Sequence, residues 1–118
     1  MGGYDLEERT FQFAKRVRMF AKDIPFSIAV AEDIKQAVRS SGSIGANYIE
    51  ANESSSDKDF LYRIKISRKE AKESIYWLRL LKETSDQLDS NRMQDLIDEA
   101  NELRRILSSI IKKRSGSE

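Results

Sequence analysis

The sequence predicts an all-α protein, an up-and-down antiparallel four-helix bundle formed by a single domain over residues 1–118. Four segments repeat apolar residues at the three- and four-residue steps of an amphipathic helix. No segment shows the strict alternation of a half-buried strand. Pro25 is the only proline and there are five glycines, so few breaks interrupt the helices. A chain of 118 residues can bury one core of this kind.

The first helix is predicted over about residues 5–23, from an apolar stripe along one face. The stripe residues are Leu6, Phe13, Val17 and Phe20. Pro25 either ends this helix or opens the next one, because its ring fixes φ and removes a hydrogen-bond donor.

The second helix is predicted over about residues 26–51, and its second half is rich in small and polar residues. The run Arg39–Ala51 holds three serines and two glycines. Two neighbouring rows with helical spacing pass through this run, so we expect two buried faces, one narrow enough for close helix packing. Glycine inside a helix costs about 1 kcal/mol against alanine, so a kink or break at Gly42 or Gly45 is the alternative.

The third helix is predicted over about residues 57–83, from regular alternation of three- and four-residue steps. Ser56, with Asp59 three residues later, resembles a capping box at its start. The fourth helix is predicted over about residues 91–113, after a loop with Asp and Ser caps. Basic residues at its end suit the negative end of the helix dipole.

The composition excludes several kinds of chemistry. The chain has no His and no Cys, which removes an imidazole base, a thiol nucleophile and the usual zinc ligands. The pairs Glu70/Glu73 and Glu99/Glu102 lack the histidines of a di-iron bundle. We therefore expect no enzyme activity, cofactor, metal or small-molecule ligand. Without a long apolar run or a secretory signal, we expect no membrane association and a cytoplasmic location.

A polar row on the second helix is the first candidate site. Arg39, Ser43, Asn47 and Glu50 follow steps of four, four and three residues and so share one face of the helix. If the row faces the third helix, we expect Arg39 to pair with Glu70, or Asn47 to pair with Glu73. An interface network is the preferred interpretation, with an ordinary solvated row as the alternative. The predicted network comprises Arg39, Ser43, Gly45, Asn47, Glu50, Glu70 and Glu73.

A basic row on the third helix is the second candidate. Such a row can follow a phosphate backbone with strong salt dependence, and nearby aromatic rings can stack on unpaired bases. The acids Asp59, Glu70 and Glu73 interleave with it, and Lys69 with Glu73 forms an ordinary i,i+4 pair, so a solvated face is preferred. The basic residues are Lys58, Lys65, Arg68, Lys72 and Arg79. The nearby aromatic residues are Tyr62, Tyr76 and Trp77.

Apolar residues also lie outside the helical seams. A bundle of this size cannot cover all of them, and a contiguous exposed apolar patch marks a partner surface. We therefore expect the chain to form a homo-oligomer. The residues concerned are Phe11, Met19, Ile49, Leu61, Ile66, Ile97 and Ile111.

Two blocks of the sequence, Gln36–Ala51 and Asp59–Leu81, resemble the bacterial four-helix-bundle proteins encoded in 23S rRNA intervening sequences. The resemblance implies an up-and-down bundle that assembles into a homopentamer with a central pore, without known enzymatic activity. A related branch of that family, the accessory variability proteins of diversity-generating retroelements, binds nucleic acid and a reverse transcriptase.

Residues and resemblance together predict a non-enzymatic, homo-oligomeric binding or scaffold module. The expected partners are further copies of the chain, as a pentamer, and RNA or a nucleic-acid-processing protein. The alternative is an RNA- or nucleic-acid-binding protein that uses the basic row of the third helix. Because the net charge is only +1, such binding depends on a local patch rather than on the overall field.

Overall fold

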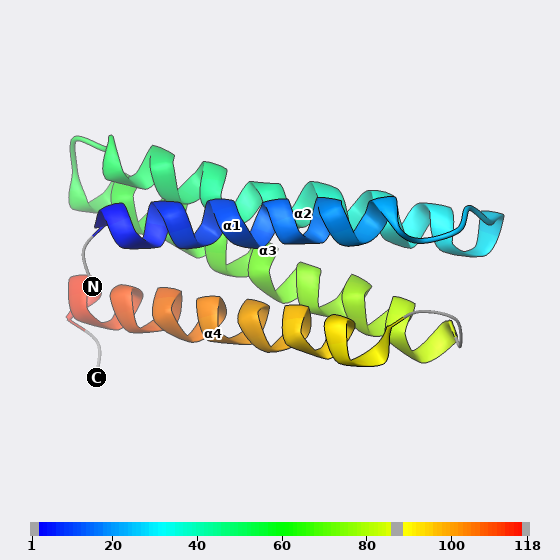
Figure 1. Ribbon diagram of the computed structural model, residues 1–118. Coiled ribbons are helices and arrows are strands. Elements are labelled where there is room, and N and C mark those ends of the chain that lie inside the picture. Colours follow the sequence, from blue (N-terminus) through cyan, green and yellow to red (C-terminus); the bar gives the residue numbers. More distant parts are fainter. Residues whose placement is uncertain (1–2, 86–88, 117–118) are drawn as a thin grey trace.

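The computed structural model describes residues 3–85 and 89–116, which form a bundle of four helices (Figure 1). The helices run alternately up and down, which confirms the predicted all-α architecture. Among the neighbouring pairs, α2 and α3 pack most extensively, whereas α1 touches α4 only sparsely. The helices are α1 (Gly3–Lys22), α2 (Ile28–Asn52), α3 (Asp57–Thr84) and α4 (Ser90–Ser115).

Short polar side chains fix the starts of three helices. The hydroxyl of Ser56 accepts a hydrogen bond from the amide of Asp59 at 3.1 Å, which confirms the predicted cap of α3. Ser27 caps α2 in the same way, so that helix begins two residues later than predicted. Asp89 caps α4. Of the predicted loop before α4, residues 86–88 lie outside the described part.

Pro25 and the two glycines of α2 are the residues most able to interrupt a helix, and the structure places them differently. Pro25 lies in the linker after α1, which ends at Lys22, and does not enter α2. Helix α2 passes through Gly42 and Gly45 without interruption, so no break occurs there. At the other end of the bundle α4 stops at Gly116, whose φ of 76° is the left-handed conformation that glycine adopts readily.

The apolar stripe predicted on α1 is buried, and its residues join the core with those of the other three helices. The seven apolar residues outside the seams divide into groups. Ile97 and Ile111 are buried, and Leu61 and Ile66 are half-buried. The other three remain exposed: Phe11 (60%), Met19 (46%) and Ile49 (47%). Within the described residues, no helix is both long and apolar enough to cross a membrane.

Candidate functional site

Helix α2 approaches α1 closely at its glycines. A Cβ atom at Gly45 would lie 2.8 Å from Oγ1 and 3.1 Å from Cβ of Thr10, closer than packed atoms come. Thr10 is only 1% exposed and its hydroxyl donates to the carbonyl of Glu7, so it has little freedom to move. The atoms nearest to a Cβ at Gly42 would be those of the Arg18 guanidinium, the end of a flexible side chain. Gly45 therefore sets the distance between the two helices.

Buried serines line the contact between α2 and α3. The hydroxyl of Ser67 donates to the backbone carbonyl of Ile44 at 2.7 Å. The hydroxyl oxygens of Ser40 and Ser74 lie 2.9 Å apart, so that one donates to the other. All three serines are completely buried. A side-chain hydroxyl reaches the backbone of a neighbouring helix only when the two axes are close, which small residues permit.

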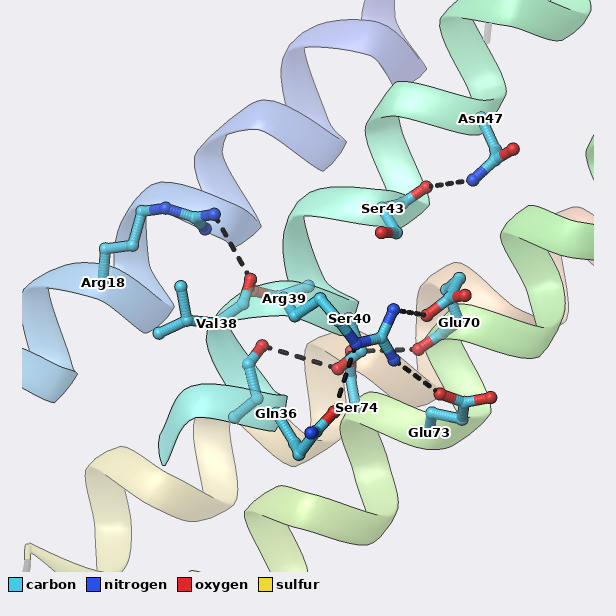
Figure 2. A network of polar contacts seen from close by, with 12 residues as sticks. Arg18, Gln36, Val38, Arg39, Ser40, Ser43, Asn47, Glu70, Glu73 and Ser74 are labelled. Carbon is cyan, nitrogen blue, oxygen red and sulfur yellow. Dashed lines mark hydrogen bonds and ion pairs between the residues drawn. The ribbon is translucent and has the colours of Figure 1, made fainter. Parts of the chain in front are cut away.

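An ion-pair cluster closes the same interface toward solvent (Figure 2). Nη2 of Arg39 donates to Oε1 of Glu73 at 2.8 Å, and Nη1 lies 3.2 Å from Oε1 of Glu70. The second contact has the distance of an ion pair without the alignment of a hydrogen bond, so the buried Oε1 of Glu70 has charge compensation but no donor. Glu70 is 8% exposed. Nε of Arg39 donates to Gln36.

The structure brings together only part of the predicted polar network. The predicted pair of Arg39 and Glu70 is present. The alternative pair of Asn47 with Glu73 is not formed, because Asn47 donates to the carbonyl of Ser43 and accepts from Arg63. Two further members of the predicted network, Gly45 and Glu50, take no part in the ion-pair cluster.

Gly45 and Glu50 lie at different places along α2. Gly45 faces Thr10 on the α1 side. Glu50 is exposed, near the end of α2. Of the buried serines, Ser67 and Ser74 share one row of α3 with Glu70, at steps of three and four residues, and the sequence sets this row against the polar row of α2. That position was the signal available in the sequence.

The predicted basic row is exposed along α3 except for Arg68, which is half-buried and donates to Ser108 of α4 at 3.4 Å. The interleaved acids Glu70 and Glu73 are turned toward Arg39. The predicted pair of Lys69 with Glu73 is therefore wrong. Among the described residues, no carboxylate forms an ion pair with the five predicted cations or with Lys69.

A shallow hollow of about 400 Å³ lies at the middle of this basic row, between α3 and α4. Its lining contains five cationic side chains and one hydroxyl, and no carboxylate. Arg104 of α4 is the member that a single-helix pattern does not reveal. The lining residues are Lys65, Arg68, Lys69, Lys72, Arg104 and Ser108.

The aromatic residues near the row differ in accessibility. Tyr62 is 61% exposed and Tyr76 is 58% exposed. Trp77 packs partly against the core, and its ring meets that of Tyr76 edge to face with centroids 5.0 Å apart. The two tyrosines are therefore the rings that an outside partner can reach.

A second hollow, of about 530 Å³, lies on the outward face of α1. The exposed side chains of Phe11 and Met19 contribute its apolar surface, and basic residues surround them. The lining residues are Phe11, Ala14, Lys15, Arg18, Met19 and Lys22. We call this surface the α1 face.

Other charged groups are engaged in structural contacts. Arg9 forms a two-pronged ion pair with Glu99, at 2.7 and 3.0 Å, and this hydrogen bonding raises the pKa of Arg9. Burial raises the pKa of Tyr48. Glu102 lies 3.6 Å from Arg105. Across the described residues, no group of three or more acidic side chains is placed to hold a metal ion.

Comparison with known proteins links this architecture to a family. Residues 4–109 match the family model described as 23S rRNA-intervening sequence protein. A crystal structure of a protein of unknown function from the S23 ribosomal protein family of Bacteroides thetaiotaomicron superposes with a TM-score of 0.80 at 32% sequence identity. The similarity covers 90% of this chain and 97% of that one. No curated protein gives a significant match.

Proposed function

Because the chain belongs to the 23S rRNA-intervening sequence protein family, we propose that it is a non-enzymatic, homo-oligomeric scaffold or binding module of the cytoplasm, assembled as a pentamer. The observation that carries this proposal is the α1 face. Phe11 and Met19 stay exposed there beside a hollow, although the bundle buries Leu6, Phe13, Val17 and Phe20 of the same helix. Exposed apolar patches of this kind mark protein interfaces.

The charges around the α1 face support a contact with a different surface of another copy. Closed rings need such head-to-tail contacts, in which two unlike patches meet. The rim of the α1 face is basic, and α4 carries Asp95, Asp98 and Glu102 in one exposed row, in which Asp95 lies beside the α1 face and Glu102 contacts Arg105. This row offers the complementary charge.

Mass measurement in solution by light scattering tests the assembly. We expect an oligomer for the parent protein and a monomer for the double variant Phe11→Glu/Met19→Glu, with unchanged helical circular dichroism. Phe26→Glu is the matched control, because Phe26 is 84% exposed but lies in the linker outside the α1 face. A parent protein that is monomeric at all concentrations contradicts the proposal, and so does a double variant that assembles normally.

The second candidate function is binding of RNA, alone or together with a nucleic-acid-processing enzyme, through the basic row of α3. The observation in its favour is that Arg39 engages Glu70 and Glu73, which leaves the cations of the row without those acidic neighbours. Replacing Lys65, Arg68 and Lys72 with Gln should abolish salt-sensitive RNA retention while the bundle stays folded. Absence of retention by the parent protein at low salt contradicts this function.

A further inference from the structure

The outermost row of α3 reaches one acid, Glu83, at its C-terminal end. From Lys58 to Arg79, alternating steps of four and three residues reach seven side chains, and every one of them is exposed. Five are basic and two are tyrosines. In order they are Lys58, Tyr62, Lys65, Lys69, Lys72, Tyr76 and Arg79. We call this set the outer row.

The tyrosines are placed symmetrically about the centre of the outer row. Tyr62 and Tyr76 each lie seven residues from Lys69. At about 1.5 Å per residue, their Cα atoms are about 21 Å apart along the helix axis. The basic hollow lies between them, where Arg104 of α4 adds a cation from a second helix. The surface therefore has a basic centre and an exposed ring on each side.

The outer row is strongly positive because Glu70 and Glu73 contact Arg39 instead of its cations, although the chain has a net charge of only +1. Arg39 of α2 engages Glu70 and Glu73, which turns both carboxylates toward α2. No carboxylate lines the hollow. The local field is therefore that of an anion-binding surface, and its length matches an extended polyanion better than a single phosphate.

We infer that the outer row and Arg104 bind single-stranded nucleic acid, with backbone phosphates at the hollow and unpaired bases stacked on Tyr62 and Tyr76. This inference rests on the second proposed function and names its ligand. Exposed aromatic rings beside a basic groove are typical of single-strand binding, because every base offers a face for stacking. In a duplex those faces are covered by neighbouring bases.

Duplex recognition fits this surface less well. A helix that reads a duplex enters the major groove, which is about as wide as the helix itself. Here α2 and α4 pack against α3, and α3 exposes only one side. A flexible single strand can instead lie along that side and reach both rings.

Fluorescence anisotropy with labelled oligouridine, and with its duplex with oligoadenosine, tests the inference. We expect tighter binding of the single strand. Tyr62→Leu and Tyr76→Leu should each weaken it at least about fivefold and leave duplex binding unchanged. Arg104→Gln should weaken it as well.

Salt dependence separates the outer row from general charge effects. The affinity of single strands falls with salt by a slope of about 0.7 per neutralised phosphate. The double variant Lys65→Gln/Lys72→Gln should therefore lose about 1.4 from the slope of log affinity against log salt. Lys112→Gln/Lys113→Gln removes the same charge from exposed residues at the end of α4 and should leave the slope unchanged.

The outcomes distinguish this inference from the function on which it rests. If neither probe binds at low salt, both are wrong. If both probes bind equally, depend on the lysines and ignore the tyrosines, the basic row binds nucleic acid but the single-strand assignment fails. If the lysine variant loses self-association and the protein retains no RNA, the outer row is instead a contact with a second copy.

Discussion

Helix α2 uses small residues on both of its buried sides, but the two contacts work differently. Toward α1 the contact is steric, because Gly45 leaves just enough room for the buried side chain of Thr10. Toward α3 it is polar, because Ser67 reaches the carbonyl of Ile44 and Arg39 joins two carboxylates. One contact is thus fixed by shape and the other by hydrogen bonds and charge.

The difference teaches how one small-residue run can orient two neighbours. Shape complementarity sets the distance between helices, and a methyl group added where there is no space lowers the stability of the bundle. Directional polar groups fix the register, since they are satisfied in only one alignment. Substitutions should therefore have unequal effects on the two sides of α2, and these effects can be measured.

The largest effect is expected at Gly45. Gly45→Leu should lower the free energy of unfolding by about 3 kcal/mol or more, because the new side chain overlaps Thr10 and must push α1 away. Denaturant unfolding followed by circular dichroism measures the change. A variant as stable as the parent contradicts the steric account of the α1 contact.

Gly42 provides the matched control for this experiment. Gly42→Ala places its methyl group against the guanidinium of Arg18, the end of a flexible side chain, which can move aside by giving up its exposed hydrogen bond to the carbonyl of Val38. The exchange should therefore be neutral or stabilise the protein by up to about 1 kcal/mol, from the better helix propensity of alanine. Gly45→Ala should be destabilising, and pairing it with Thr10→Ala should recover part of the loss, as a double-mutant cycle shows.

The next effect in size is expected at the ion-pair cluster. Arg39→Met leaves the buried carboxylate of Glu70 without its cation and should cost about 1–3 kcal/mol, a range that allows for the partial exposure of Arg39. Glu70→Gln keeps the shape and leaves Arg39 paired with Glu73, so it should cost less than about 1 kcal/mol. Equal losses in the two variants, measured by urea unfolding, contradict this asymmetry.

The sequence predicts the helices well because their signals are local. The apolar spacing and the Ser56 cap act within one or two turns, so the predicted ends of the helices agree with the structure within about two residues. The start of α2 shifts because Ser27, rather than Pro25, defines it. The continuity of α2 through Gly45 was not predictable from propensity, since tertiary packing compensates for the cost of glycine.

The candidate sites depend on which way each helix is turned, and that is harder to predict. The pairing of Arg39 with Glu70 was foreseen, but the sequence placed Glu73 with Asn47 or Lys69. In the structure Arg39 contacts both acids, so their carboxylates face α2 rather than the cations of the basic row. Arg104 belongs to another helix, so no pattern within α3 reveals its place in the basic hollow.

The smallest effect is expected at Ser67. Ser67→Ala removes the hydrogen bond to Ile44 but creates little empty space, and the carbonyl keeps its partner within helix α2. The loss should be about 1 kcal/mol, the usual net value of such a bond. Ser109→Ala, at an exposed position of α4, should change stability by less than about 0.5 kcal/mol. If the two serine variants unfold at the same denaturant concentration, the buried hydroxyl of Ser67 contributes only tolerance for close packing. The register of α2 against α3 then depends on the Arg39 cluster and on the hydrogen bond between Ser40 and Ser74.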